Sequence, residues 1–314
     1  DGTSEAVSFF MRRENVLKKL DDPLRSLEAR AGTLGAIADA YYHRYRGGAG
    51  KELDRTPAGT VLVGGIATEA RRLAGGGQYR EAVRIVSQLP TSPSGVEPLV
   101  HEALKWADRF EESAEHPNLS GRLHSMLATY GKDTALRREH RAKSTAAYLR
   151  GNNLHQAAGQ LQIAIEGASS NEDFAALFDQ CLDIAKKETD YQAECAYGAV
   201  AYASWGKGLP PDLVKRVGDL GRRALPLIDR RYRPPARMTF RASWSAFLAN
   251  SGDMAASRAT NDYVRNYYQN VAQNAYMWAT YLSHVGTKVK ANHPGYATEL
   301  HEQFERAGGA SDFW

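Results

Sequence analysis

Cysteine is scarce in this chain, and long hydrophobic runs are absent. Only two of the 314 residues are cysteines, which excludes a small domain held together by several disulfides and leaves too few thiols for a zinc site built from cysteine alone. No stretch of about 18 consecutive apolar residues occurs, so no membrane-spanning helix is predicted. With an apolar content of 43%, the chain is instead expected to bury a core of its own.

A strong excess of one charge is also lacking. Lys and Arg number 40 and Asp and Glu number 36, so the net charge is +4 at pH 7. A dedicated nucleic-acid-binding protein usually concentrates more positive charge than this. The composition therefore disfavours nucleic acid as the partner without excluding it.

The two cysteines and the start of the chain leave the compartment open. Cys181 and Cys195 both lie in apolar segments with helical spacing, where a small buried hydrophobe is the favoured role and a single disulfide between adjacent helices is the alternative. The chain begins at Asp1 without a basic-then-apolar leader, which fits either a trimmed chain or a mature form after removal of a leading segment. We expect a soluble protein, either cytoplasmic or exported after processing.

Apolar residues recur with a period near 3.6 along almost the whole chain, and the alternation typical of strands is scarce. We therefore predict an all-α fold of many short helices joined by short turns, which is typical of an array of antiparallel helical hairpins rather than of a four-helix bundle. The predicted helices cover 22–46, 59–74, 79–89, 96–115, 119–130, 132–150, 153–167, 171–187, 189–205, 211–228, 235–250, 253–270, 271–290 and 294–307.

A glycine-rich loop, Gly47-Gly48-Ala49-Gly50, follows the first predicted helix. We predict an N-terminal helical region over residues 1–56 and one helical-repeat array over 57–314, because no later linker is long enough to separate independent domains. The loop does not match a phosphate-binding loop, since Lys51 is followed by Glu52 rather than by Ser or Thr.

Three turns share a layout. The first is Gly77-Gln78-Tyr79-Arg80-Glu81-Ala82, and weaker copies begin at Asn152 and Gly252. The positions that correspond to Tyr79 and Ala82 are Leu154 and Ala157 in the second copy and Met254 and Ser257 in the third.

This layout resembles the tetratricopeptide repeat, whose second helix typically opens with Gly, any residue, Tyr, two further residues and Ala. The resemblance implies a superhelical array that holds a protein or peptide on its concave face. The third copy departs from the pattern, because Asn261 stands where the family has a large apolar residue. The turn-to-turn distances of 75 residues (77 to 152) and 100 residues (152 to 252) are also not multiples of the family's repeat length.

No catalytic or metal motif stands out. The chain has nine histidines but no His-Glu-x-x-His signature, and it has no Gly-x-Ser-x-Gly elbow. We therefore predict no catalytic residues, no metal and no cofactor.

The densest charge feature is a run of seven arginines with a single acid, Asp229, among them. Guanidinium groups bind phosphate, sulfate and carboxylate, so this run is the candidate binding surface. The alternative is that several of the arginines pair with acids of neighbouring helices. The run consists of Arg222, Arg223, Arg230, Arg231, Arg233, Arg237 and Arg241.

Aromatic residues gather in the last sixth of the chain, where Tyr and Trp could provide contact area to a partner. Packing into the core is the alternative interpretation. The candidate assembly contacts are Tyr267, Tyr268, Trp278, Phe313 and Trp314.

Three functions remain open from the sequence. The favoured hypothesis is a non-enzymatic helical-repeat scaffold that binds a protein or peptide partner, an acidic one if the arginine run takes part. The second is a structural subunit of a filament, shell or virion, which would self-assemble through its aromatic C-terminal third. The third is an all-α enzyme that acts on an acidic polymer.

Overall fold

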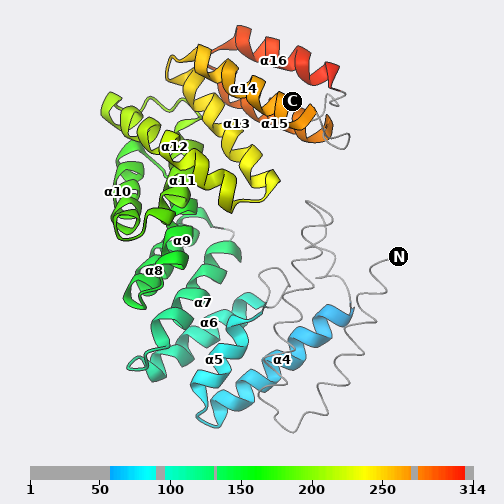
Figure 1. The fold of residues 1–314 in the computed structure, drawn as a ribbon. Coiled ribbons are helices and arrows are strands. Elements are labelled where there is room, and N and C mark those ends of the chain that lie inside the picture. The colour runs from blue at the N-terminus through cyan, green and yellow to red at the C-terminus, as the bar shows by residue number, and fades with distance from the viewer. Residues whose placement is uncertain (1–56, 90–95, 131–132, 270–274, 308–314) are drawn as a thin grey trace. The chain divides into compact units, whose positions relative to one another are not determined.

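The structure, a computed structural model, describes residues 57–89, 96–130, 133–269 and 275–307 (Figure 1). These ranges contain thirteen α-helices, two short 3-10 helices and no strand. The fold is therefore all-α, as the period of the sequence predicted. The predicted helix 22–46 and the glycine-rich loop after it lie outside the described residues.

The chain divides into two compact units, residues 1–157 and 158–314. This boundary falls within the segment that the sequence predicted to be one array. The helices of the first unit are α4 (Pro57–Gly75), α5 (Tyr79–Ser87), α6 (Val96–Ala107), η1 (Asp108–Phe110), α7 (His116–Tyr130) and α8 (Thr134–Arg150), and α9 (Leu154–Glu166) crosses the boundary. Those of the second unit are α10 (Asn171–Lys187), η2 (Thr189–Tyr191), α11 (Gln192–Ala203), α12 (Pro211–Arg231), α13 (Pro234–Asn250), α14 (Met254–Gln269), α15 (Ala275–Val289) and α16 (Pro294–Arg306).

Two predicted helices are shorter in the structure. The segment predicted as 96–115 leaves the α-helical path after Ala107 and continues as η1, and the next helix begins at His116 rather than at 119. The segment predicted as 189–205 opens with η2 before α11 begins at Gln192. The remaining described helices agree with the sequence to within a few residues.

The three turns that resemble one another in sequence also share a hydrogen-bonded geometry. Each contains one residue with a positive φ, which glycine adopts without strain and which asparagine tolerates better than most residues. These residues are Gly77 (80°), Asn152 (51°) and Gly252 (91°). In each turn the next N–H donates to the carbonyl five residues back, a pattern that terminates a helix. The bonds are Gln78 to Leu73 (2.9 Å), Asn153 to Tyr148 (2.8 Å) and Asp253 to Leu248 (2.9 Å).

Each unit has its own apolar core. In the first unit the core joins α4, α5, α6 and α7, and the strongly amphipathic α5 places Val83, Ile85 and Val86 in it with no exposed surface. In the second unit a core joins α13, α14, α15 and α16. Consecutive helices such as α13 and α14 pack side by side (Figure 1), so each hairpin buries a face that it could not bury alone.

The cysteines are buried as predicted, but they do not act only as small hydrophobes. Cys181 on α10 and Cys195 on α11 form a disulfide, with their Cα atoms 5.6 Å apart and neither residue exposed. The favoured prediction is therefore wrong in this respect, and the disulfide alternative is confirmed. The bond fixes α10 against α11 in the second unit.

Among the described residues, no helix combines the length and the apolar character that crossing a membrane requires.

Candidate functional site

Two of the predicted arginines and one of the predicted tyrosines meet at a single cavity in the second unit. Arg237 and Arg241 lie one helical turn apart on α13, and Tyr263 and Tyr267 lie one turn apart on α14. All four line a cavity of about 110 Å³, together with Asp229 at the end of α12 and Val264. We call these four residues the Arg-Tyr surface.

Arg241 is fixed on two sides. Its Nη2 donates a hydrogen bond of 2.5 Å to Oδ2 of Asp229, and its guanidinium carbon lies 4.3 Å from the ring centroid of Tyr263. Its side chain is only 13% exposed. Burial next to a carboxylate and a ring face holds the guanidinium in one orientation, and Asp229 compensates its charge.

Arg237 is placed differently. Its Nε donates to the backbone carbonyl oxygen of Tyr232, and it forms no ion pair with an acid among the described residues. The carbonyl group fixes the side chain without neutralising it. Arg237 therefore contributes an uncompensated positive charge to the cavity.

The two tyrosines of the surface face solvent. Tyr263 is 49% exposed and Tyr267 is 54% exposed, although both are large side chains. Their rings are nearly parallel, with centroids 6.4 Å apart. An exposed aromatic pair next to arginines is unusual on the free surface of a folded protein and is typical of binding sites.

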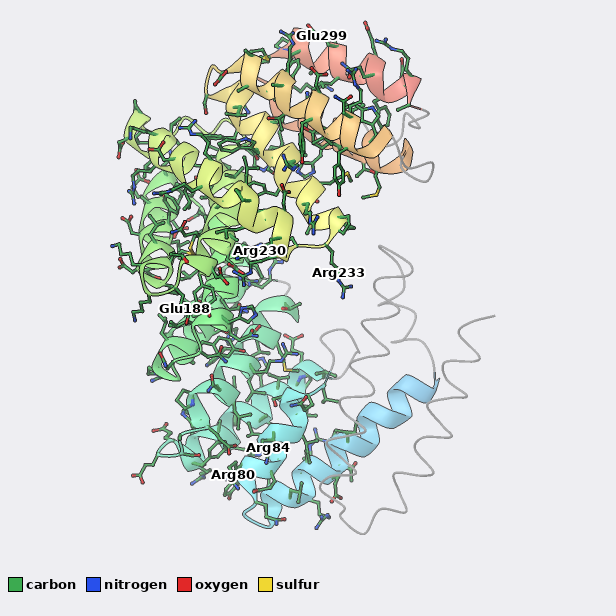
Figure 2. All side chains as sticks on the ribbon, in the orientation of Figure 1. Arg80, Arg84, Glu188, Arg230, Arg233 and Glu299 are labelled. Carbon is green, nitrogen blue, oxygen red and sulfur yellow. A yellow bond between two sulfur atoms is a disulfide. The ribbon has the colours of Figure 1, made fainter. Side chains whose placement is uncertain are left out.

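The other five predicted arginines lie outside this cavity. Three of them pair with acids, which agrees with the alternative interpretation of the run: Arg222 with Asp219 (2.9 Å), Arg230 with Asp190 (3.3 Å) and Arg231 with Glu194 (3.4 Å). The side chains of Arg223 and Arg233 form no hydrogen bond or ion pair within the described parts of the chain. Figure 2 shows the side chain of Arg233 projecting from the ribbon at the start of α13.

The structure describes the side chains of only two of the five predicted assembly contacts, Trp278 and Tyr267. Trp278 is half-buried, stacks on the buried Tyr281 with ring centroids 5.3 Å apart, and packs against the second core. Tyr267 belongs to the Arg-Tyr surface. The side chain of Tyr268 is not among those described, and Phe313 and Trp314 lie outside the described residues.

A buried network of hydrogen bonds joins α13 and α14, which carry the Arg-Tyr surface, to α15 and α16. Oδ1 of Asn261 accepts hydrogen bonds from Oγ of Ser245 (2.7 Å) and from the hydroxyl of Tyr281 (2.6 Å), while its Nδ2 donates to the hydroxyl of Tyr296 (2.6 Å). These four residues come from α13, α14, α15 and α16. The network thus sets the register of α14 against α13, on which the position of Tyr263 beside Arg241 depends.

Lys288 on α15 is a second buried polar centre that the sequence did not reveal. Its Nζ donates to Oγ of Ser204 (2.7 Å) and to Oγ of Ser243 (2.9 Å), and the residue is 5% exposed. Burial lowers the pKa of Lys288 to about 8. The ammonium connects the end of α11 with α13 and α15.

Asp229, Tyr263 and Val264 are the members of the cavity that the sequence analysis did not select. Tyr263 could have been found from its spacing of four residues to Tyr267, which places both on one face of a helix. Asp229 was visible only as the lone acid in the arginine run.

Comparisons with protein-family models, with curated proteins and with solved structures found no match to this chain. Within the described residues, no group of three or more His, Cys, Asp or Glu side chains is arranged to hold a metal ion. The function must therefore be argued from the site itself.

Proposed function

We propose that this protein is a helical-hairpin scaffold that binds an acidic peptide segment of a partner protein at the Arg-Tyr surface. The observation that carries the proposal is the exposed, stacked pair Tyr263 and Tyr267 in one cavity with Arg237 and Arg241. Tyr and Arg are the residue types that contribute most to binding energy at protein interfaces.

The tyrosines supply contact area. Each ring loses few rotamers on binding and buries a large apolar face, while its hydroxyl can still hydrogen-bond at the edge of the interface. Because the two rings are already stacked, a bound peptide would find them ordered. Preorganisation of this kind lowers the entropic cost of association.

The arginines give the surface its charge preference. Asp229 compensates Arg241, whereas no acid among the described residues pairs with Arg237, so the cavity carries a net positive charge. A guanidinium binds a carboxylate through two parallel hydrogen bonds, which favours Asp or Glu on the partner. Nucleic acid is disfavoured, because an acid lines the cavity and the net charge of the whole chain is only +4.

A selection of random peptides displayed on phage tests this proposal. The full chain and its variant Tyr263→Ser/Tyr267→Ser would be used as separate baits, after circular dichroism has shown that both are folded. We expect the wild type to enrich peptides in which Asp or Glu residues flank an apolar side chain, and the variant not to enrich them. Equal enrichment on both baits, or peptides without acids, would contradict the proposal.

The variant Trp205→Ser is a matched control. Trp205 is also a large aromatic residue of the second unit, and it is 48% exposed, but it does not line the cavity. Its removal tests whether any exposed ring suffices. We expect this variant to select the same peptides as the wild type.

A further inference from the structure

A second and larger cavity lies in the first unit. It has a volume of about 520 Å³, within the range of sites that hold small molecules. Three side chains of α7 line it at intervals of four residues, His116, Ser120 and His124, and they therefore form one stripe along that helix. The other lining residues come from α8 (Lys143, Ala146 and Arg150) and from the segment of η1 (Asp108 and Glu111).

Ser120 is the most informative residue of this stripe. It is only 7% exposed, and its hydroxyl has no hydrogen-bond partner within the part of the chain that the structure describes. A hydroxyl in the middle of a helix usually bonds to a backbone carbonyl of the preceding turn. Ser120 instead offers a donor and an acceptor to the cavity that it lines.

Charges of both signs surround this hydroxyl without neutralising one another. The side chains of Asp108, Glu111 and Arg150 form no hydrogen bond or ion pair with any described residue. Lys143 pairs with Glu139 at 2.6 Å, but both side chains are about half exposed, so this pair contributes little and can exchange for another partner. The acids come from the η1 segment and the cations come from α8.

His124, at the C-terminal end of the stripe, is neutral at pH 7. Nδ1 of His124 lies 3.0 Å from Nδ1 of His140, so one ring donates to the other. Burial, with the charges of His140 and Lys143 as smaller causes, lowers the pKa of His124 to about 4. His124 therefore lines the cavity as a neutral ring whose second nitrogen is a donor or an acceptor, depending on the tautomer.

We propose that this cavity binds a small zwitterion, the class that includes free amino acids, with its carboxylate at Arg150 and Lys143 and its ammonium group at Asp108 and Glu111. The Ser120 hydroxyl donates a further hydrogen bond to the ligand. Two unpaired acids oppose a purely anionic ligand, and the two cations oppose a metal ion or a simple amine. Only a ligand that carries both charges pairs with the acids of the η1 segment and with the cations of α8 at the same time.

The test is thermal unfolding of the full chain with each of the twenty amino acids at millimolar concentration. For any that raises the midpoint, the N-acetyl and amide derivatives serve as half-ligands that lack one charge. We expect at least one amino acid to stabilise the protein and both of its derivatives to bind at least about tenfold more weakly. Equal binding of the N-acetyl derivative would show an anion site and overturn the proposal, as would the absence of a shift with all twenty.

Variants locate the binding in this cavity. Arg150→Gln, the pair Asp108→Asn/Glu111→Gln, and Ser120→Ala should each weaken the responsive amino acid, the charge changes by about tenfold or more. Arg109→Gln is the matched control, because Arg109 is exposed on η1 but does not line the cavity. If Arg109→Gln weakened binding as much as Arg150→Gln, or if none of the cavity variants did, the site would lie elsewhere and the proposal would fail.

Discussion

The guanidinium carbon of Arg241 lies 4.3 Å from the centroid of the Tyr263 ring, while its Nη2 bonds to Asp229. One arginine thus joins three helices, α12 through the carboxylate, α13 through its own backbone, and α14 through the ring. The consequence is an aromatic surface that is ordered before any partner arrives.

The substitution Asn261→Leu should destabilise the protein, although a large apolar residue is what the tetratricopeptide pattern has at this position. Removing the amide leaves the buried hydroxyl of Tyr281 without its partner, at a cost of about 1–3 kcal/mol. The hydroxyls of Ser245 and Tyr296 each lose one hydrogen bond but keep one to Ser257. Urea unfolding measures this loss. The control is Ala259→Leu at an exposed position of the same helix, for which we expect little change. A neutral or stabilising effect of Asn261→Leu would show that the network is dispensable.

Reduction of the Cys181–Cys195 disulfide should destabilise the second unit. The bond closes a loop with a sequence separation of 14, and cross-links of about 15 residues contribute about 3 kcal/mol. Thermal unfolding with and without reductant measures the effect. The unfolding midpoint of the variant Cys181→Ala/Cys195→Ala should not change with reductant. If the wild type, unfolded without reductant, showed two free thiols in a thiol titration, the disulfide would not exist.

Stability should fall as the pH drops below about 6.5. The folded protein lowers the pKa of His124 to about 4, mainly by burial, whereas the ordinary pKa of a histidine side chain is 6.5. Between these values the unfolded chain binds more protons, so stability falls from pH 6.5 towards pH 4 and is constant above pH 6.5 for this group. Urea unfolding at pH 7 and pH 5 should therefore show a smaller difference for His124→Gln than for the wild type. An equal loss of stability between pH 7 and pH 5 in the wild type and in His124→Gln would show that His124 does not cause the pH dependence.

Gly198→Ala should be among the most damaging small substitutions. A Cβ at this position would lie 2.5 Å from the backbone oxygen of Gln162, so α11 would have to move away from α9. Overpacking of this kind costs about 1–3 kcal/mol. The control is Gly159→Ala on α9, where no atom lies within 4 Å and alanine favours the helix by up to about 1 kcal/mol. Thermal unfolding measures the difference. Similar unfolding midpoints for the two variants would mean that α11 and α9 do not pack tightly at Gly198.

The sequence predicts local structure well because local structure depends on neighbours along the chain. The period of the apolar residues located the helices, and Gly77, Asn152 and Gly252 marked turns whose positive φ few other residues accept. The sequence also placed Arg237, Arg241 and Tyr267 in candidate sets, since arginine runs and aromatic clusters are visible without a fold.

Contacts between distant residues could not be predicted in this way. Asn261 looked like a departure from a repeat pattern, because its partners Ser245, Tyr281 and Tyr296 lie up to 35 residues away on three other helices. The arginine run suggested one surface, but three of its members pair with acids outside the cavity. Adjacency in sequence does not fix which helix face a residue occupies or which acid it meets.

The affinity of the strongest selected peptide is the measurement that tests the central claim most directly. Fluorescence anisotropy would give this affinity for the wild type, for Tyr263→Ser/Tyr267→Ser and for Trp205→Ser. If the Arg-Tyr surface binds the peptide, the double variant should bind at least about tenfold more weakly and Trp205→Ser should match the wild type. Equal affinities for all three proteins would show that the peptide binds elsewhere and would contradict the account.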